Sequence, residues 1–481
     1  MQTIIIWFRR DLRLSDNPAL HAAKGARIIP VYIHAPEEDS PWPAGGASRW
    51  WLHHSLRALA TQLNTLGSRL IIRRGSSLSA LQDLISETGA DAVYLNRLYE
   101  PASITRDSHI KTALSEQGIT YRSFAGMLLF EPWQIQTGAG SAYKVFTPFW
   151  QACQKRGLPH DLSPAVRKLP PVSKRLASVR LDSLALLPAI AWDSQFYTLW
   201  QPGESGARSR LRKFIKNQLG GYDNARDFPA RTATSGLSAH LHFGEISPRQ
   251  IVYAIEQARQ QRRDSLYAKN AQSFVRELAW REFTHHVLYH FPHTQQQVLN
   301  PRFEKFPWQK RQTRLLRAWQ RGQTGFPIVD AGMRELWATG TMHNRVRMIV
   351  GSLLTKNLGH HWLAGAKWFW DTLVDADLAQ NSFNWQWVAG CGADAAPYFR
   401  IFNPITQSEK FDSEGIYLRR WVPELARLPN KYIHAPWQAP QVVLQNVGID
   451  IGKDYPHPVC DLKTTREQAL LAYKQHTRSS A

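Results

Sequence analysis

The sequence predicts a mixed α/β protein in two parts, a doubly wound, Rossmann-like parallel sheet followed by an all-α region. Short β-rich apolar runs alternate with helical periodicity up to about residue 130. Beyond about residue 207 such runs disappear and only helical patterns remain. The length of 481 residues is sufficient for two hydrophobic cores. We therefore expect an α/β domain over residues 1–130, a connector over 131–206 and a helical domain over 207–481.

Five runs are expected to form the strands of the sheet, because each is short, apolar and rich in β-branched or aromatic residues. In chain order they are TIIIWF, RIIPVYIH, RLIIRR, DAVYLN and YRSFAG. Between the second and third runs, leucines recur at steps of three and four, which predicts one apolar face of a helix. These are Leu52, Leu56, Leu59, Leu63 and Leu66. No GxGxxG follows the first run, so the dinucleotide-binding fingerprint is absent.

The middle and the end of the chain have different patterns. The segment from Gly157 to Gly206 is rich in proline and weakly periodic, which indicates a long connector. After it, RSRLRKFIKNQL and NRVRMIVGSLLTKNL show helical spacing. The second domain should therefore be all-α.

The composition has two anomalies. Lysine and arginine number 59 against 38 acidic residues, a formal net charge of +21. This excess favours a polyanion-binding surface, with nucleic acid as the leading partner and simple solubility as the alternative. The chain also contains 19 tryptophans, of which most would fill cores and some could stack on flat ligands.

Several classes of protein are excluded by what the sequence lacks. It has no run of 18 apolar residues and no signal peptide, and Cys153, Cys391 and Cys460 are too widely spaced for a metal pair or a disulfide framework. We find no Walker loop, HExxH, nucleophile elbow or Ser/His/Asp signature. The histidine doublets 285–286 and 360–361 are weak metal candidates, because adjacent helical residues point in different directions. We expect a cytoplasmic protein with no membrane association and no metal site.

Five longer motifs occur in order along the chain. They are WFRRDLRLSDNPAL, ARDFPARTATSGLSAHLHFGEISPRQ, ELAWREF, GFPIVDAGMRELWATGTMHNRVRM and NWQWVAGCGADAAPYFRIFNP. Together they resemble the DNA photolyase/cryptochrome family over nearly the whole chain, and within it most closely the cyclobutane pyrimidine dimer (CPD) photolyases. This resemblance implies an α/β antenna domain, a connector, and a helical domain that binds FAD in a U-shaped conformation.

The resemblance implies a set of flavin contacts. The hydroxyl and backbone N–H groups of TSGLS would hold the pyrophosphate, although a plain helix cap is the alternative. Asn381 would lie beside flavin N5, where a neutral amide favours a repair enzyme over a plant-type cryptochrome. The implied FAD residues are Tyr222, Thr234, Ser235, Gly236, Leu237, Ser238, Glu277, Arg281, Asn344, Arg347, Asp375, Asp377 and Asn381.

The resemblance also implies a pocket for a base lesion that is flipped out of DNA. Trp280 and Trp387 would form its apolar side, and Glu277 would contact the polar edges of the dimer and stabilise negative charge on it. Asn344 and Met348 stand where enzymes for (6-4) photoproducts carry histidines, which favours CPDs. The basic residues implied at the mouth of the pocket, where they would bind phosphates, are Arg226, Arg345 and Arg400.

Three tryptophans match an electron-transfer route to the flavin. Trp385 would be its flavin-proximal member, Trp362 its middle member and Trp308 its surface member. Gln386 separates Trp385 from Trp387 and directs the two rings differently. Core packing is the alternative role for any one of these rings.

The antenna part departs from the best-known folate-binding pattern. Trp50 stands where a folate-contacting histidine is expected, and Glu100 matches an acidic position. We expect 5,10-methenyltetrahydrofolate as the antenna chromophore, with Trp50 available to stack on its pterin, and 8-hydroxy-deazaflavin as the alternative.

The resemblance implies a monomeric, light-driven photolyase that acts on UV-damaged DNA containing CPDs and uses FAD in its reduced form, FADH⁻. A cryptochrome photoreceptor and a DNA-binding flavoprotein without repair activity are the alternatives. The chain ends about 60 residues after RRWVPEL, without the long extension that receptors usually carry. We therefore expect repair.

Overall fold

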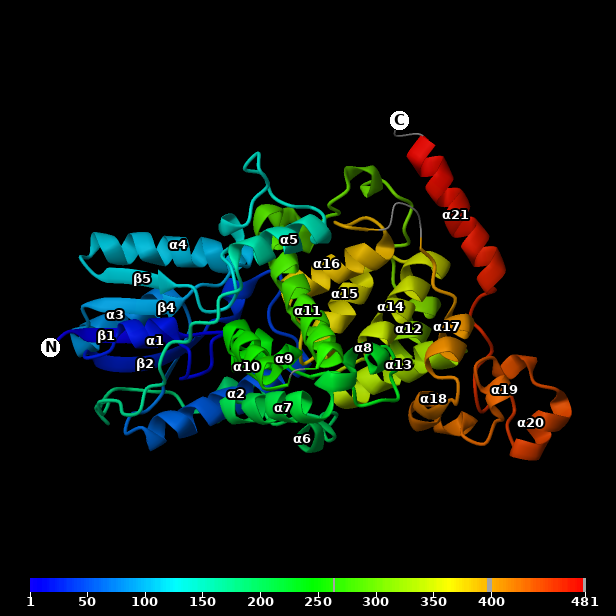
Figure 1. Cartoon of the computed structure of the whole chain (residues 1–481), viewed down its shortest axis with the longest axis horizontal. Coiled ribbons are helices and arrows are strands. Elements are labelled where there is room, and N and C mark those ends of the chain that lie inside the picture. The colour runs from blue at the N-terminus through cyan, green and yellow to red at the C-terminus, as the bar shows by residue number, and fades with distance from the viewer. Residues whose placement is uncertain (263, 396–399, 479–481) are drawn as a thin grey trace.

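The computed structural model describes residues 1–262, 264–395 and 400–478. A five-stranded sheet lies toward one end of the molecule, and helices form the rest (Figure 1). The strands are β1 (Thr3–Phe8), β2 (Arg27–His34), β3 (Ile71–Arg74), β4 (Ala92–Asn96) and β5 (Thr120–Phe124). They pair in the order β3-β2-β1-β4-β5, and every neighbouring pair is parallel. All five predicted strands and the doubly wound parallel sheet are confirmed.

The sheet separates two apolar cores. Ile4, Ile6 and Phe8 of β1 belong to one core, and Ile5 and Trp7 belong to the other, because successive side chains of a strand point to opposite faces. Helices α1 (Pro18–Ala22) and α2 (Gly46–Thr65) pack on the first face. Helices α3 (Ser77–Thr88) and α4 (Pro101–Glu116) pack on the second. Apolar strands with helices on both faces are typical of a parallel sheet.

The predicted leucine face of α2 is largely inside. Leu56, Leu59 and Leu63 are buried against the sheet, while Leu52 and Leu66 are half-buried at the edges of this face. Leu66 lies one residue past the helix, as its C-cap. The three-and-four spacing therefore located the helix to within one residue at its C-terminal end.

Most of the segment between the two parts has no regular secondary structure. It contains the short turns η2 (Pro132–Gln134) and η3 (Leu181–Leu184) and the helices α5 (Phe146–Arg156) and α6 (Phe196–Leu199). Helix α5 packs into the core of the helical part through Phe146, Phe149 and Trp150. Within residues expected to form a connector, the apolar run FTPFW thus forms part of the second core.

The helical part is built around α11 (Ser265–His290), which crosses the centre of the molecule (Figure 1). The other helices of eight or more residues are α7 (Glu204–Asn217), α10 (Pro248–Gln261), α12 (Arg314–Arg321), α13 (Pro327–Thr339), α14 (Asn344–Ser352), α15 (Trp362–Thr372), α16 (Leu378–Ala389), α17 (Pro404–Phe411) and α21 (Leu462–Arg478). Shorter helices are α8 (Tyr222–Ala225), α9 (Ser238–His242), α18 (Ile416–Trp421), α19 (Asn430–Ile433) and α20 (Gln441–Val447). Within the described residues after 204 there is no named strand, as predicted.

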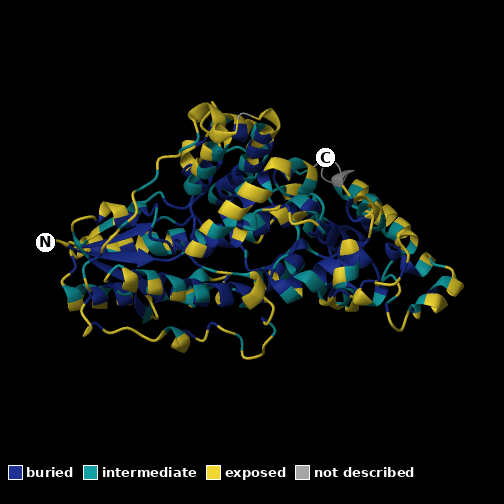
Figure 2. Ribbon diagram, turned by 60° about the horizontal axis from the view of Figure 1, so that its bottom comes forward, coloured by how far each residue is buried: buried dark blue, intermediate teal, exposed yellow. Residues whose placement is uncertain are grey.

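Figure 2 shows that the strands and the inward faces of the helices are buried and that the outer helix faces are exposed. None of the helices described is both long and apolar enough to cross a membrane.

Candidate active site

Four helices bring most of the predicted site residues together. Helix α16 begins after Asp377, whose carboxylate caps it by accepting a hydrogen bond from the Gln380 N–H at 3.0 Å. Helices α11, α14 and α15 all contact α16. The side chains on the facing sides of these helices therefore form one site.

Helix α15 carries a glycine where the Trp385 ring approaches it. A Cβ atom on Gly365 would lie only 2.1 Å from the Trp385 ring, so glycine is required for this close approach. The Asn381 amide, one turn earlier on α16, donates a hydrogen bond to the Ala366 carbonyl at 3.0 Å. Trp385 and Asn381 therefore both face α15, and Trp385 is buried with 4% exposure.

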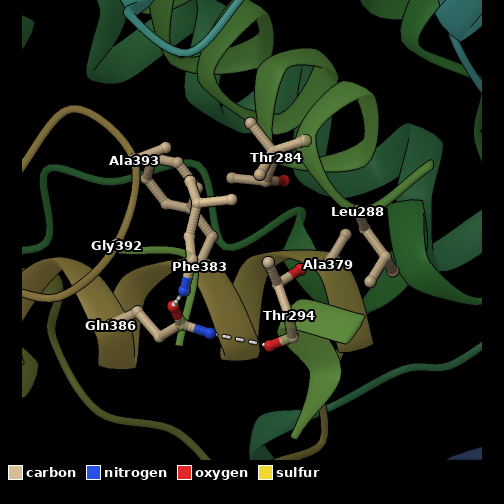
Figure 3. A pocket seen from close by; sticks show the side chains of 10 residues that line it. Thr284, Leu288, Thr294, Ala379, Phe383, Gln386, Gly392 and Ala393 are labelled. Atoms are coloured by element: carbon tan, nitrogen blue, oxygen red, sulfur yellow. Dashed lines mark hydrogen bonds between the residues drawn. The ribbon is translucent and has the colours of Figure 1, made fainter. Parts of the chain in front are cut away.

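Gln386 attaches the next turn of α16 to the segment that follows α11. Its amide nitrogen donates to the carbonyl oxygens of Thr294 at 2.7 Å and Gln297 at 2.9 Å. Figure 3 shows Gln386 and Phe383 of α16 facing a small pocket opposite Thr284 of α11. Trp385 is buried in the core that also contains Trp362, whereas Trp387 is half-buried and packs against both this core and the core beside Trp280.

The other two predicted electron-transfer tryptophans are joined by a histidine ring. The His361 ring centre lies 5.1 Å from that of Trp308 and 5.6 Å from that of Trp362. Trp362, the first residue of α15, is fully buried. Trp308 is only 7% exposed, whereas the sequence analysis placed it at the surface. The expectation fails because the Phe306 ring, 4.7 Å from Trp308, covers it.

Two predicted residues with different roles form an ion pair. Arg226, expected to bind phosphate, donates to the Glu277 carboxylate at 2.6 Å. Both side chains are about one third exposed, at 32% and 36%. The Arg226 guanidinium also lies 5.3 Å from the centre of the Tyr222 ring. The pair thus places a positive charge directly beside the carboxylate expected to contact the lesion.

The predicted apolar side of the pocket lies where α11 and α16 meet. Trp280 is stacked on Phe146 of α5, with ring centres 3.6 Å and planes 8° apart. Trp280 and Trp387 are both half-buried at the edge of the same apolar cluster. Each ring therefore has part of its surface uncovered, as a stacking residue requires.

Helix α14 presents polar groups in its first two turns. Arg347 Nη2 donates to both carboxylate oxygens of Asp375, each at 3.0 Å. Arg345 pairs with Asp227 at 2.8 Å and lies 4.0 Å from the Met348 sulfur. Asn344 is exposed at the start of the helix, as is Arg400 farther along the chain. The structure thus places Arg347 with Asp375, both expected at the flavin, and Arg345 with Met348.

The predicted phosphate-binding residues 234–237 lead into the five-residue helix α9, and Ser238 is the first residue of that helix. Gly236 has a φ of +61°, a left-handed conformation that favours glycine. A Cβ atom on Gly236 would lie 2.5 Å from the Arg210 guanidinium of α7. Thr234 and Ser238 are exposed, and Leu237 is buried. A cation therefore lies directly beside the turn expected to hold a pyrophosphate.

A search with sequence models of protein families matches residues 4–171 to DNA photolyase and residues 274–475 to the FAD binding domain of DNA photolyase. The deoxyribodipyrimidine photo-lyase of Agrobacterium fabrum is 49% identical over 98% of this chain and 97% of that protein. The chain belongs to the DNA photolyase family. Cryptochrome-2 of Arabidopsis thaliana is 40% identical over 96% of this chain and 77% of that protein. The crystal structure of a bacterial class III photolyase from Agrobacterium tumefaciens superposes with a TM-score of 0.95 at 48% identity, covering 99% of this chain and 98% of that one.

The buried polar atoms of this photolyase-family chain fit FAD, the cofactor of the matched domain. Arg281 is 4% exposed, and only its Nη1 has partners, the nearer being the Met127 carbonyl at 3.1 Å. Its Nε and Nη2 atoms and Ser382 Oγ are buried without a hydrogen-bond partner. Leaving such atoms unpaired costs about 1–3 kcal/mol each. A guanidinium and a hydroxyl are suitable partners for the phosphate and hydroxyl groups of FAD.

The Asp377 carboxylate is ionised by its surroundings. Its Oδ2 lies 3.4 Å from His285 Nε2 and 3.5 Å from His242 Nδ1. Burial alone would raise the pKa of Asp377, but the two imidazoles more than offset this, and the pKa lies well below its usual range. The photolyase fold therefore keeps a negative charge at the start of α16.

The two predicted antenna residues lie in different places. Trp50 is 1% exposed and closed in by Trp51, His54, Phe196 and Tyr197. A stacked chromophore would need an uncovered ring face, which Trp50 does not have, so the expected stacking on a pterin is not supported. Glu100 pairs with Arg10 and is buried. One of its oxygens lies within 4.8 Å of both a His285 ring nitrogen and an Asp377 oxygen, so Glu100 faces α11 and the start of α16 in the helical part.

The group formed by Glu100, His285 and Asp377 has the residue types of a cation site. Arg10 already provides a positive charge against Glu100. The histidine doublet 285–286 shows the expected divergence, since His286 instead accepts from the Tyr143 N–H at 3.0 Å and lies near the Pro132 carbonyl.

The sequence reasoning missed Arg210 and the role of Arg10. Arg210 lies in RSRLRKF, where three arginines recur with helical spacing and none is distinguished from the others. Arg10 follows the first strand, where any basic residue could simply be solvated. Residues 396–399, within the motif NWQWVAGCGADAAPYFRIFNP, lie outside the described residues.

Proposed function

We propose that this photolyase-family protein is a light-driven CPD photolyase. The observation that carries the proposal is that Glu277 and Trp280 lie three residues apart on α11, while Trp280 and Trp387 of α16 are both half-buried against the same apolar cluster. A pyrimidine dimer has this combination of features, two flat apolar bases with polar carbonyl and N–H edges. Two of the similar proteins are named photolyases, which supports the same function.

The chain's own residues would bind and position the lesion. Flipping the dimer out of the duplex costs a few kcal/mol, less than for an intact pair because its bases are already poorly stacked. Trp280 and Trp387 would stack on its apolar faces and keep water away from them. Glu277, oriented by Arg226, would bind the polar edges.

When bound, FAD in its reduced form supplies a light-driven electron to the dimer. The two carbon–carbon bonds that join the bases within the cyclobutane ring then break and the electron returns, so that no net oxidation occurs. Asn381, fixed by its bond to α15, would hold the environment of flavin N5. Trp385, Trp362 and Trp308 would deliver electrons from outside when the cofactor is oxidised. Methenyltetrahydrofolate, or alternatively 8-hydroxy-deazaflavin, remains our proposal for the antenna.

The test uses the purified protein, chemically reduced and mixed with an oligonucleotide that carries one cis-syn thymine dimer. We expect conversion to intact thymines under blue light and none in the dark. A second oligonucleotide with a (6-4) photoproduct should stay unchanged. Repair of the second but not the first would reassign the substrate, and repair of neither would remove the proposed activity.

A cryptochrome-type photoreceptor is the second candidate, favoured by the 40% identity to Cryptochrome-2 of Arabidopsis thaliana. In that case the protein would bind FAD and photoreduce it, yet leave both lesions intact. The repair assay therefore separates the two functions directly.

A further inference from the structure

Part of the connector carries a concentration of positive charge that no role proposed above uses. We call residues 167–180 the basic strap. No acidic residue occurs between Asp161 and Asp182, so nothing within this stretch of sequence balances its charge. The basic residues of the strap, all of them exposed, are Arg167, Lys168, Lys174, Arg175 and Arg180.

The strap is attached to the edge of the parallel sheet. Strand β3 is an edge strand, and its Ile72 exchanges two hydrogen bonds with the strap. The Val179 N–H donates to the Ile72 carbonyl at 3.0 Å, and the Ile72 N–H donates to the Ser178 hydroxyl at 2.9 Å. The Leu169 N–H donates to the Leu66 carbonyl at 2.9 Å. These bonds cover backbone groups that an edge strand leaves open, and they fix the path of the strap.

Apolar side chains fix the strap as well. Leu169 is buried in the core beneath α1 and α2, and Val172 and Leu176 are buried in the core beneath α3 and α4. Pro170 and Pro171 restrict the backbone between these anchors to extended conformations. The exposed charges are therefore carried by a backbone that is already ordered, so little backbone entropy is lost when a ligand contacts them.

Acidic side chains from the rest of the molecule neutralise little of this charge. Arg180 lies 3.9 Å from Asp182, but the two side chains are 88% and 71% exposed, so water screens this pair. In the part of the chain that the structure describes, the other four basic residues of the strap have no ion pair within 4.0 Å. Their charges are thus available to an anionic partner.

The spacing of the charges favours an extended polyanion over a small anion. Arg167 and Lys168 precede the two prolines, and Lys174 and Arg175 follow them. Corresponding members of these two pairs are seven residues apart, at most about 22 Å at ~3.1 Å per residue of extended backbone. A small anion would occupy only one pair. Duplex DNA carries one phosphate charge per about 1.7 Å of its axis, so it offers partners to both.

We propose that the basic strap binds the phosphate backbone of duplex DNA, outside the lesion pocket and without reading the sequence. Lysine and arginine make such contacts, and each contact releases a counterion. DNA is favoured over other polyanions because the family model that covers the sheet is that of DNA photolyase. The inference goes beyond the proposed function, since the strap would bind DNA with or without a lesion.

The test measures binding of the FAD-loaded protein to an undamaged duplex of roughly 20 base pairs, about two helical turns. Fluorescence anisotropy at several salt concentrations gives the slope of log K against log salt. The double variants Arg167→Gln with Lys168→Gln and Lys174→Gln with Arg175→Gln should each make this slope shallower by about two units. A slope equal to that of the parent in both double variants would overturn the proposal.

Two further double variants serve as controls. Lys24→Gln with Lys111→Gln removes two exposed charges near α1 and α4, which contact β5 at the opposite edge of the sheet, and should keep the parent's slope. Arg167→Lys with Arg175→Lys retains both charges of the strap and should also keep it. A change as large as that of the glutamine variants would overturn the proposal in either control, because the effect would then reflect total charge or altered packing.

Other polyanions and the repair reaction are tested separately. Vesicles of phosphatidylglycerol and phosphatidylcholine, and a single-stranded RNA of equal length, are the alternative probes. If the strap variants lose binding to either probe but keep the parent's slope on the duplex, the assignment to DNA is wrong. Strap-dependent slopes in a protein that repairs neither lesion would support the strap and contradict the proposed function. Repair of the dimer together with parent-like slopes in the strap variants would contradict the strap alone.

Discussion

The structure pairs Arg226 with Glu277, although the sequence predicted separate roles for the two residues. Their ion pair at 2.6 Å means that a mutation of either one affects the other. Because both are about one third exposed, the pair adds no more than about 1 kcal/mol to stability. Its significance lies in the orientation of the carboxylate that would contact the lesion.

A double-mutant cycle of Arg226→Ala and Glu277→Ala should show coupling in the affinity for dimer-containing DNA. We expect a coupling energy of about 0.5–3 kcal/mol, since the two residues share one contact. The matched cycle of Arg345→Ala and Glu277→Ala should be additive, because Arg345 pairs with Asp227 instead. Fluorescence anisotropy with a dimer-containing oligonucleotide measures both cycles. Additivity in the first cycle would mean that the ion pair does not persist in the complex.

Glu282 is a buried acidic residue whose protonation should change the stability of the protein with pH. Its carboxylate accepts from the Leu129 and Phe130 N–H groups at 2.7 and 3.2 Å. Burial raises its pKa to about 7 in spite of these bonds and of Arg281. The folded state therefore binds the proton more tightly than the unfolded state, and this residue's contribution to stability falls as the pH rises from about 4.5 to about 7.

Glu282→Gln should therefore become more stable relative to the parent as the pH rises. The predicted change in the difference between pH 5 and pH 8 is at most about 3 kcal/mol, from 2.5 pKa units at 1.36 kcal/mol each. Urea unfolding of both proteins at the two pH values measures it. A difference that is independent of pH, or that favours the parent at pH 8 more than at pH 5, contradicts a raised pKa.

Helices α15 and α16 approach each other at Gly365 and Trp385. The glycine permits contact between the ring and the α15 backbone, and the Asn381–Ala366 hydrogen bond fixes the register. Trp362 also lies on α15, three residues before Gly365. Contact between α15 and α16 therefore positions both Trp362 and Trp385.

Gly365→Ala should destabilise the protein by about 1–3 kcal/mol through overpacking, although alanine favours helices. Trp385→Leu should relieve the clash, so that adding Gly365→Ala to a Trp385→Leu background costs less than adding it to the parent. Thermal unfolding of the four proteins tests this. Equal costs in both backgrounds would show that the ring is not what excludes the methyl group.

The whole molecule carries a charge of +21, but its arginines are not equivalent. Arg226 and Arg345 already face Glu277 and Asp227, which neutralise part of their charge. Arg400 is exposed. Such differences decide how many counterions are released when DNA binds.

We predict that Arg400→Ala lowers the slope of log K against log salt by about one unit for damaged and undamaged DNA alike. Arg226→Ala and Arg345→Ala should lower it by less, because each leaves an acidic neighbour behind. Trp280→Ala and Trp387→Ala should leave the slope unchanged and lower the preference for dimer-containing DNA by roughly 1–3 kcal/mol. Binding isotherms at several salt concentrations distinguish these effects. Tryptophan variants that keep full dimer preference would refute the assignment of the pocket.

The sequence by itself determined the sheet, the two-part organisation and the family. Strand and helix patterns depend on neighbours two to four residues apart, so TIIIWF and the α2 leucines were sufficient to identify β1 and α2. The five long motifs occur in order along the chain, and they were sufficient to identify the family.

Contacts between distant residues were decided only by the tertiary structure. Glu100 and Asp377 lie near His285 although they are far apart in the chain, and Arg210 lies against Gly236. Trp308 lies against His361, which is far from it in the chain. A charged or aromatic side chain can pair with any partner that packing brings within a few ångströms, and the spacing of residues along a chain does not specify that partner.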